Sequence, residues 1–269
     1  MTAITSHNRK YLIAGAVFVA LAVSGYGLAR FYPALGPIAG TLTPQLYVDS
    51  LPDAQIPLSG RYLLVDAASA RLYMIENGRV HDSMRVIVGR PETPTPALKS
   101  VIGYETLNPY WHVSADLAKT IIAPRVLKEG DAYLAQQGYE VVTAFGPNAR
   151  VLSPDSVDWK AVAAGEAEVL VRQLPGPANS LGHFKFNLPN SDGIYLHDTP
   201  KKELFANDER NLSHGCVRLE DAQKLARWLL GHDPPAASVP EQQVALPSPV
   251  PITISYLDAH SQMELALLQ

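Results

Sequence analysis

Residues 61–88 read RYLLVDAASARLYMIENGRVHDSMRVIV, and this stretch predicts the start of a β-sheet. Segments 62–66 and 71–76 within it are rich in branched and aromatic residues, which favour strands. Asn77 and Gly78 follow the second segment, and both residue types tolerate the positive φ angles of a tight hairpin turn. Residues 79–88 are therefore expected to pair with the strand at 71–76.

Strand-like patterns continue through most of the chain, at 101–107, 139–143, 168–174, 183–187, 194–197 and 252–257. One clear helix is expected near 221–230, where apolar residues recur at helical spacing and Gly231 follows. Its single apolar face suits packing against a sheet. Together these patterns predict a mainly β domain over residues 61–257.

Residues 108–138 interrupt the strands with helical sequence. Ser114 is a suitable N-cap for a short helix, Pro124 interrupts the pattern, and Gly138 ends a second helix. We expect an insertion here. The pattern leaves two arrangements open, a lid over a cleft or a helical layer packed on the sheet.

The amino-terminal sequence predicts export. Residues 11–29 contain no charged side chain, and a helix of this length nearly spans a bilayer. Arg9 and Lys10 precede this run, which places the amino terminus in the cytoplasm and the rest outside. We expect a cytoplasmic tip and membrane anchor at 1–30, with a cleaved signal peptide and a buried soluble helix as alternatives. A Pro-rich spacer at 31–60 and a tail at 258–269 would flank the domain.

The composition of the 269-residue chain is that of a folded protein, with 47% hydrophobic and 18% charged residues. The formal net charge is −4, so the chain as a whole lacks the excess of positive charge that attracts nucleic acid, and no nucleic-acid partner is expected. The chain contains one cysteine, Cys216, which excludes an internal disulfide. Three roles remain for Cys216: a buried inert thiol, an intermolecular disulfide, or a nucleophile.

Cys216 lies in the segment SHGCVR at 213–218, and His197 ends a predicted strand upstream. A thiol needs a nearby base or cation to become nucleophilic, and an imidazole can serve as both. Gly215 removes a side chain, so backbone N–H groups can approach an oxygen that gains negative charge. Arg218 adds a cation that suits a substrate carboxylate. Zinc binding by the two histidines and the cysteine is the weaker alternative, so we expect no metal and no cofactor.

This segment, with His197 upstream, resembles the signature of the L,D-transpeptidase (YkuD) catalytic domain, in which a histidine precedes a Ser/Thr-His-Gly-Cys motif. Other segments resemble the larger periplasmic branch of that family, which carries a helical lid: 86–91, 95–96, 107–113, 175–182, 185–186, 188–190, 195–200 and 246–251. The resemblance covers residues 61–257. It implies a β-sandwich with short helices and a helical lid at 108–138. It also implies a periplasmic domain, either held in the inner membrane by one helix at 11–29 or secreted.

The resemblance further implies a peptidoglycan L,D-transpeptidase. Cys216 would attack the carbonyl between the third and fourth residues of a tetrapeptide donor stem, release D-alanine and form a thioester. An acceptor stem would resolve that thioester as a 3→3 crosslink. His197 would be its base or ion-pair partner, oriented by Asp198 or by a backbone carbonyl. The backbone N–H groups of His214, Gly215 and Cys216 would bind the oxyanion.

Candidates for substrate contacts are more weakly supported; they are Arg218, Ser213, Asn179, Asp198 and Tyr195. The expected partners are peptidoglycan stem peptides and, as inhibitors, carbapenems. Two other functions stay open. The same cysteine would serve an L,D-carboxypeptidase or a peptidase that releases proteins from the wall. A non-catalytic wall-binding module is the third hypothesis.

Overall fold

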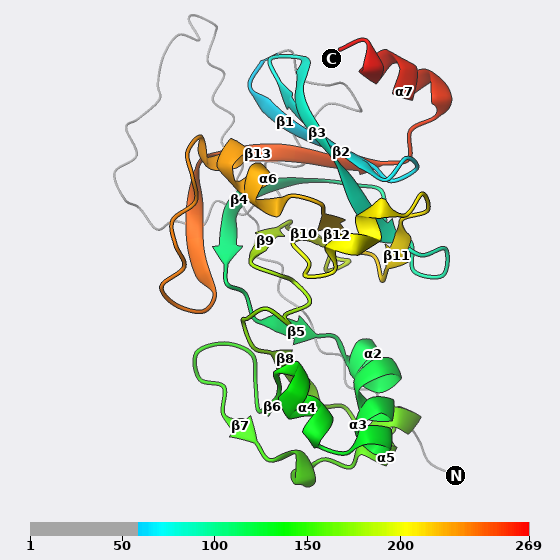
Figure 1. Ribbon diagram of the computed structural model, residues 1–269, viewed down its shortest axis with the longest axis vertical. Helices are drawn as coiled ribbons and strands as arrows, with labels where there is room; N and C mark the ends of the chain where they lie inside the picture. The colour runs from blue at the N-terminus through cyan, green and yellow to red at the C-terminus, as the bar shows by residue number, and fades with distance from the viewer. Residues whose placement is uncertain (1–58, 269) are drawn as a thin grey trace, which may run out of the picture. The chain divides into compact units, whose positions relative to one another are not determined.

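The computed structural model describes residues 59–268 (Figure 1). The anchor predicted at 1–30, its apolar run at 11–29 and nearly all of the spacer at 31–60 lie outside the described residues. Within residues 59–268, no helix has both the length and the apolar character needed to cross a membrane.

Within the described part, nine strands form one sheet in the order β11-β3-β12-β10-β9-β4-β13-β1-β2. The strands are β1 Arg61–Asp66, β2 Arg71–Glu76, β3 Arg79–Gly89, β4 Leu98–Leu107, β9 Phe184–Asn187, β10 Tyr195–His197, β11 Asn211–Ser213, β12 Val217–Leu219 and β13 Gln242–Ser255. β2, the last strand in this order, also pairs with β3, the second strand. The hydrogen-bonded sheet is therefore closed. This closure corrects the expected β-sandwich: the strands form one closed sheet instead of two separate sheets.

The hairpin predicted at 71–88 is confirmed, and its turn explains the pairing. Asn77 and Gly78 have φ angles of +51° and +76°, as a tight turn between β2 and β3 requires. The helix predicted near 221–230 is also confirmed as α6, Ala222–Leu230, which begins at an Asp221 side-chain cap and ends at Gly231. Leu225, Ala226 and Leu229 of α6 are buried in the core of the closed sheet.

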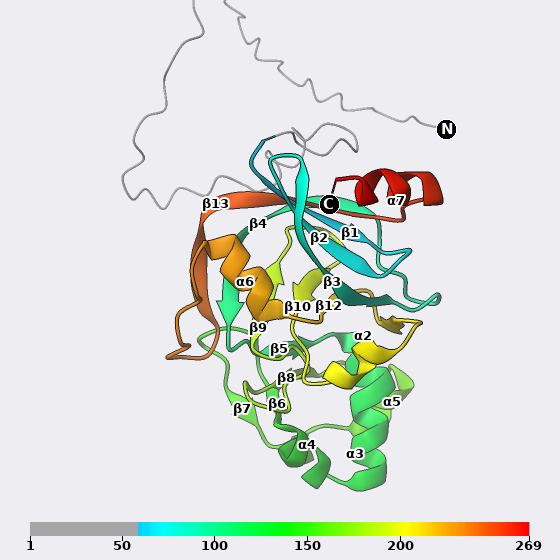
Figure 2. The ribbon, with the colours of Figure 1, turned by 45° about the horizontal axis from the view of Figure 1, so that its top comes forward.

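Residues 109–182, called the insertion from here on, leave and re-enter the closed sheet at adjacent points. The Asn108 N–H donates to the His183 carbonyl at 2.9 Å, so the two ends of the insertion lie side by side. The insertion contains its own sheet, β5-β8-β6-β7, formed by Trp111–Val113, Leu170–Gln173, Tyr139–Val142 and Val151–Leu152 (Figure 2).

Short helices pack on that second sheet. They are α2 Ala115–Leu117, the π-helical turn η1 Ala118–Ile122, α3 Ala123–Glu129, α4 Ala132–Gln137, η2 Pro154–Ser156 and α5 Trp159–Ala164. A separate hydrophobic core, with Ile122, Leu134 and Val171 fully buried, joins helices to sheet. The insertion is therefore longer than the predicted 108–138. The strands predicted near 139–143 and 168–174 do form, but they join the second sheet.

The carboxyl end, expected to be a tail at 258–269, forms the helix α7, Ala259–Ala266. Leu265 of α7 is buried against Tyr62, Leu64 and Ile75 on the outer face of β1 and β2. The buried Asp66 carboxylate accepts hydrogen bonds from the Leu257 N–H and the Gln262 side chain, at 3.1 and 3.0 Å. The end of the chain is thus attached to the sheet by apolar and polar contacts.

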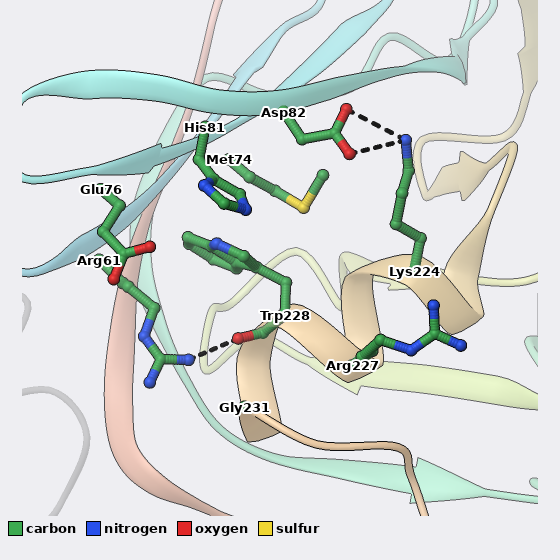
Figure 3. A pocket seen from close by; sticks show the side chains of 9 residues that line it. All are labelled: Arg61, Met74, Glu76, His81, Asp82, Lys224, Arg227, Trp228 and Gly231. Atoms are coloured by element: carbon green, nitrogen blue, oxygen red, sulfur yellow. Dashed lines mark hydrogen bonds and ion pairs between the residues drawn. The ribbon is translucent and has the colours of Figure 1, made fainter.

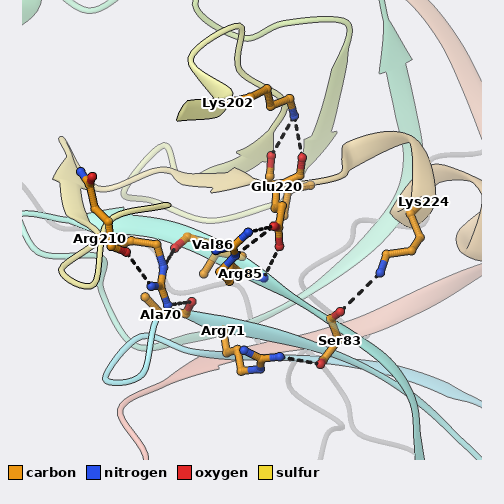
Figure 4. A network of polar contacts seen from close by, with 11 residues as sticks. Ala70, Arg71, Ser83, Arg85, Val86, Lys202, Arg210, Glu220 and Lys224 are labelled. Atoms are coloured by element: carbon orange, nitrogen blue, oxygen red, sulfur yellow. Dashed lines mark hydrogen bonds and ion pairs between the residues drawn. The ribbon is translucent and has the colours of Figure 1, made fainter. Parts of the chain in front are cut away.

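A network of basic side chains ties the connection between β10 and β12 to the closed sheet (Figure 4). Lys202, on η3 (Lys202–Ala206), donates to the Glu220 carbonyl at 2.8 Å. Arg210 donates to the Val86 and Ala70 carbonyls, both at 3.2 Å. The Glu220 carboxylate in turn binds the Arg85 guanidinium. These contacts fix the chain on both sides of the segment that carries Cys216.

Candidate active site

Residues 213–216 form a turn over the end of β3. β11 pairs Ser213 with Gly89 on one side of β3, whereas β12 runs antiparallel on the other side. The turn therefore carries the chain across the end of β3 and places Cys216 immediately before β12. The Ser213 hydroxyl donates to the Cys216 carbonyl at 2.6 Å and accepts from the Gly215 N–H at 3.1 Å. Ser213 is buried, so it shapes the turn in place of the predicted substrate contact.

Thr95 and two glycines determine the shape of this turn. The buried Thr95 hydroxyl accepts from the Gly89 N–H at 2.9 Å and donates to the Gly215 carbonyl at 2.7 Å. A Cβ at Gly89 would lie 2.2 Å from the Thr93 carbonyl oxygen. Gly215 has a φ of +115°, which side-chain-bearing residues rarely adopt. A side chain at either glycine would therefore displace the turn that carries Cys216.

β10 places His197 beside this turn. β10 and β12 are parallel neighbours in which His197 pairs with Arg218, two residues after Cys216. The His197 Nδ1 lies 2.5 Å from the Asp198 carbonyl oxygen, so Nδ1 carries the proton and Nε2 is left as an acceptor. The sequence left two groups that could orient His197, the Asp198 carboxylate and a backbone carbonyl. In the structure, the Asp198 backbone carbonyl makes this contact.

The Asp198 carboxylate has partners other than the His197 ring. It accepts from the His183 N–H at 2.9 Å and from the Lys202 ammonium at 2.6 Å. Gly182 passes so close that a Cβ there would lie 2.3 Å from Asp198 Oδ2. The carboxylate therefore joins three segments of the chain, and neither predicted role for it, in orienting His197 or in touching substrate, is what the structure shows.

Tyr195 connects Cys216 with His197. Tyr195 and His197 alternate along β10 and share a face, with ring centroids 5.6 Å apart. The Tyr195 backbone N–H and hydroxyl both hydrogen-bond to the Cys216 sulfur. Because Cys216 immediately precedes β12, the register of β10 and β12 places it diagonally across from His197. The Cys216 thiol itself points to the Gly193 carbonyl, with Sγ 3.8 Å from that oxygen.

Burial keeps both groups neutral in the resting protein. Burial, together with the positive charge of Arg218, lowers the pKa of the His197 imidazole to about 3. Burial also raises the pKa of the Cys216 thiol, while hydrogen bonds from Tyr195 and the charges of Lys185 and Arg218 oppose this change. The site therefore favours a neutral thiol and a neutral imidazole over a preformed thiolate–imidazolium pair.

Two of the three predicted oxyanion donors remain free. The Gly215 N–H is used by Ser213. For the N–H groups of His214 and Cys216, the described part of the chain provides no hydrogen-bond acceptor. The His214 side chain is exposed, and its pKa is lowered by partial burial and by the neighbouring Arg90 charge. The geometry thus assigns His214 a backbone role.

Asn179 lies at the base of the insertion, away from any open surface. Its Nδ2 donates to the Pro109 and Leu174 carbonyls at 3.0 and 2.9 Å, and its Oδ1 accepts from the Leu181 N–H at 2.7 Å. Asn179 is 1% exposed. It joins the two ends of the insertion and does not provide the substrate contact that was predicted. Arg218, by contrast, is half-buried and its charge acts on Cys216, and its contact with substrate stays a prediction.

The family model of the L,D-transpeptidase catalytic domain (YkuD) matches residues 60–252. This range contains the insertion, most of the closed sheet and the turn with Cys216. The chain belongs to this family. The match does not distinguish the branch with a helical lid, so that part of the resemblance stays a prediction.

Known relatives agree with this assignment over part of their length. A provisionally named L,D-transpeptidase of Haemophilus influenzae is 35% identical over 168 residues, which cover 62% of this chain and 33% of the relative. The chain therefore spans about a third of the length of this curated relative.

Solved L,D-transpeptidases are more distant. The enzyme from Mycobacterium smegmatis is 13% identical with a TM-score of 0.37, over 73% of this chain and 59% of that one. The catalytic domain of the E. faecium enzyme, acylated by ertapenem, is 12% identical with a TM-score of 0.37, over 74% and 99%. The family assignment rests on the match of the catalytic-domain model to residues 60–252.

Two further residues of this L,D-transpeptidase domain touch the site without having been singled out. Lys185 on β9 pairs with His197, and its Nζ lies 4.5 Å from the centroid of the Tyr195 ring. Trp111 on β5 donates a side-chain hydrogen bond to the Tyr195 hydroxyl. Both occur in segments that resemble the family, but only the pairing of distant strands and the return of the insertion to the closed sheet bring them close to Cys216.

Other hollows in the family domain lie away from Cys216. A cavity of about 460 Å³ lies between α6 and strands β1 to β3 (Figure 3). It is lined by Arg61, Met74, Glu76, His81, Asp82, Lys224, Arg227, Trp228 and Gly231. None of these belongs to the predicted site. In the described part of the chain, no group of three or more His, Cys, Asp or Glu side chains is arranged to hold a metal ion.

Proposed function

We propose that this protein is a peptidoglycan L,D-transpeptidase that forms 3→3 crosslinks through a thioester on Cys216. One observation carries the proposal: a neutral imidazole, with Nδ1 held by the Asp198 carbonyl, lies diagonally across from a half-buried thiol. This arrangement meets the requirements of nucleophilic catalysis, namely a nucleophile, a base beside it and a third group that orients the base. Membership of the family supports the substrate class.

The first half-reaction transfers the donor acyl group to sulfur. Cys216 Sγ attacks the carbonyl carbon that joins the third and fourth stem residues, and the thiol proton passes to His197 Nε2. The free N–H groups of His214 and Cys216 stabilise the oxyanion, where loss of one such donor typically costs about 2.7–4 kcal/mol. The C–N bond then breaks, and the departing amine takes the proton from the imidazolium. D-alanine leaves and the thioester remains.

The second half-reaction returns the thiol. The side-chain amine of an acceptor stem attacks the thioester and passes a proton to His197 Nε2. The new amide forms as the C–S bond breaks, and the imidazolium protonates the sulfur. If water replaces the amine, the product is a tripeptide, so the same residues would then perform carboxypeptidase chemistry.

The proposal includes two features beyond the reaction centre. A periplasmic location with a single span at 11–29 is supported by the apolar run and the basic residues before it. A lid role for the insertion is supported by the hydrogen bond from Trp111 to Tyr195, which joins the insertion to the residue that contacts Cys216.

The test is incubation of the purified protein with disaccharide-tetrapeptide, followed by mass spectrometry. We expect crosslinked dimers, free D-alanine, and a carbapenem adduct on Cys216. Cys216→Ala should lose all three, and His197→Asn should lower the rate of adduct formation by at least about 10²-fold. If tripeptide monomers form without dimers, the activity is L,D-carboxypeptidation and not transpeptidation. Absence of products together with unchanged wall binding by Cys216→Ala would establish a binding module instead.

A further inference from the structure

Two cations flank His197 without a counter-ion. Lys185 pairs with His197 from β9, and Arg218 pairs with it from β12 on the opposite side. Both side chains are half-buried. Across the described residues, neither cation has a carboxylate oxygen within the 4.0 Å of an ion pair. Other cations of the domain do have such partners, as Arg85 has Glu220 and Arg172 has Glu140.

Burial opposes the charge of both cations, and a third cation stands near one of them. Burial lowers the pKa of both Lys185 and Arg218, and the neighbouring Arg90 lowers that of Arg218 further. The charge of Glu241 raises the pKa of Lys185, but the Glu241 carboxylate lies beside His112, with Oε1 3.9 Å from Nε2. A half-buried charge without a counter-ion is costly for the folded protein. Such a cost is offset when an anionic ligand binds between the charges.

We propose that Lys185 and Arg218 form a carboxylate-binding site for the residue that the donor stem loses. This inference rests on the proposed function. In a donor that ends at its fourth residue, the terminal carboxylate carbon is three bonds from the scissile carbonyl carbon, within about 4 Å. A site for that carboxylate must therefore adjoin the nucleophile. Adjacent strands lie about 4.8 Å apart. The cations on β9 and β12 therefore stand on either side of His197, at a strand spacing similar to the distance between the two carbons.

The two cations have complementary roles in this site. The Arg218 guanidinium offers a planar pair of donors that fits a carboxylate, whereas the Lys185 ammonium is a mobile point charge. Held between them, the leaving residue keeps its nitrogen near His197, the group that must protonate the departing amine. The site thus selects donors whose leaving residue bears a free carboxylate. A donor that ends in a carboxamide should be discriminated against.

The experiment measures binding in the full chain with Cys216→Ser, which cannot form the thioester. Calorimetry compares two tetrapeptide donors that differ in one group, a terminal carboxylate or a terminal carboxamide. We expect the carboxylate donor to bind about 10- to 100-fold more tightly. Adding Lys185→Met or Arg218→Gln should weaken the carboxylate donor by a similar factor and leave the carboxamide donor unchanged. Lys185→Arg should keep most of the preference, and the exposed Lys201→Met should keep all of it.

Equal affinities of the Cys216→Ser protein for the two donors would overturn the proposal. Equal losses for both donors in Lys185→Met and Arg218→Gln would also overturn it, because the cations would then support the fold or the site in general. Failure of the proposed function looks different. It appears as an absence of crosslinked dimers in the reaction of the parent protein, whatever preference the two donors show in binding.

Discussion

Cys216 and His197 show how burial controls the chemistry of single residues. The sulfur receives hydrogen bonds from Tyr195 and feels two nearby cations, yet burial still raises its pKa. The imidazole is neutral because protonation would place a further charge next to Arg218 in a buried site. In the proposed mechanism, proton transfer from sulfur to nitrogen therefore accompanies attack on the substrate.

Alkylation by iodoacetamide tests this protonation state. Because Cys216 is the one cysteine, the label reports on it alone. Its thiolate forms at higher pH than that of an ordinary thiol, whose pKa is about 8.5, so the rate should keep rising above that pH. Tyr195→Phe removes one donor to sulfur and should move the profile to still higher pH. A rate that is already constant at pH 7 would instead demonstrate a preformed thiolate.

At the scale of elements, β4 carries a buried carboxyl into the packed interior. Glu105 pairs with Phe186 on β9 and Val244 on β13, and it is fully buried. Neither carboxyl oxygen has a hydrogen-bond partner among the described residues. Burial raises the pKa of Glu105 to about 7, and the charge of His232, just after α6, acts in the opposite direction.

Glu105→Gln should make the protein more stable at alkaline pH. The folded protein holds the Glu105 proton up to about pH 7, whereas the unfolded chain releases it near 4.5. Wild-type stability therefore falls as pH rises through this window, by about 3 kcal/mol in total. The variant lacks this loss, so urea unfolding should show a gain near 3 kcal/mol at pH 8 and almost none at pH 4.5. A pH-independent difference would contradict the assignment.

The described part of the domain has two main hydrophobic cores, and a smaller cluster packs α7 against β1 and β2. The closed sheet and α6 surround the first core, and the insertion encloses the second. Asn108 and His183 are hydrogen-bonded where the chain leaves the closed sheet and returns to it. Within the insertion, the Asn179 side chain donates to the Pro109 carbonyl and so joins the same two segments. This topology lets the closed sheet form its pairings without the insertion.

Replacing residues 109–182 by a short glycine-rich linker tests this organisation. We expect the closed sheet to unfold cooperatively in urea, with a smaller m-value because less surface is exposed on unfolding. Release of D-alanine from tetrapeptide should fall at least about 10-fold, since the contact of Trp111 with Tyr195 is lost. Trp111→Phe in the full chain separates the loss of that hydrogen bond from the loss of the insertion. Unchanged release would exclude the insertion from the site.

Part of this fold is visible in local sequence, and part is not. The β2–β3 hairpin and α6 were predicted, because turn residues, caps and periodicity act over a few neighbouring residues. The partner of a strand is not a local property. Residues 139–142 therefore looked like any other strand of the domain, yet they pair with β7 and β8 in the insertion. The closure of the main sheet through β2 and β3 escaped prediction for the same reason.

The sequence by itself determined the mainly β class and singled out Cys216 as the proposed nucleophile with His197 as its partner. Each of these follows from residue chemistry or from neighbours along the chain. Tertiary structure decided which carbonyl orients His197, that Ser213 takes the Gly215 N–H, and that Lys185 stands beside His197. It also decided the charge state of the site. These properties depend on burial and on strands far apart in sequence, whose pairing arises only when the sheet closes.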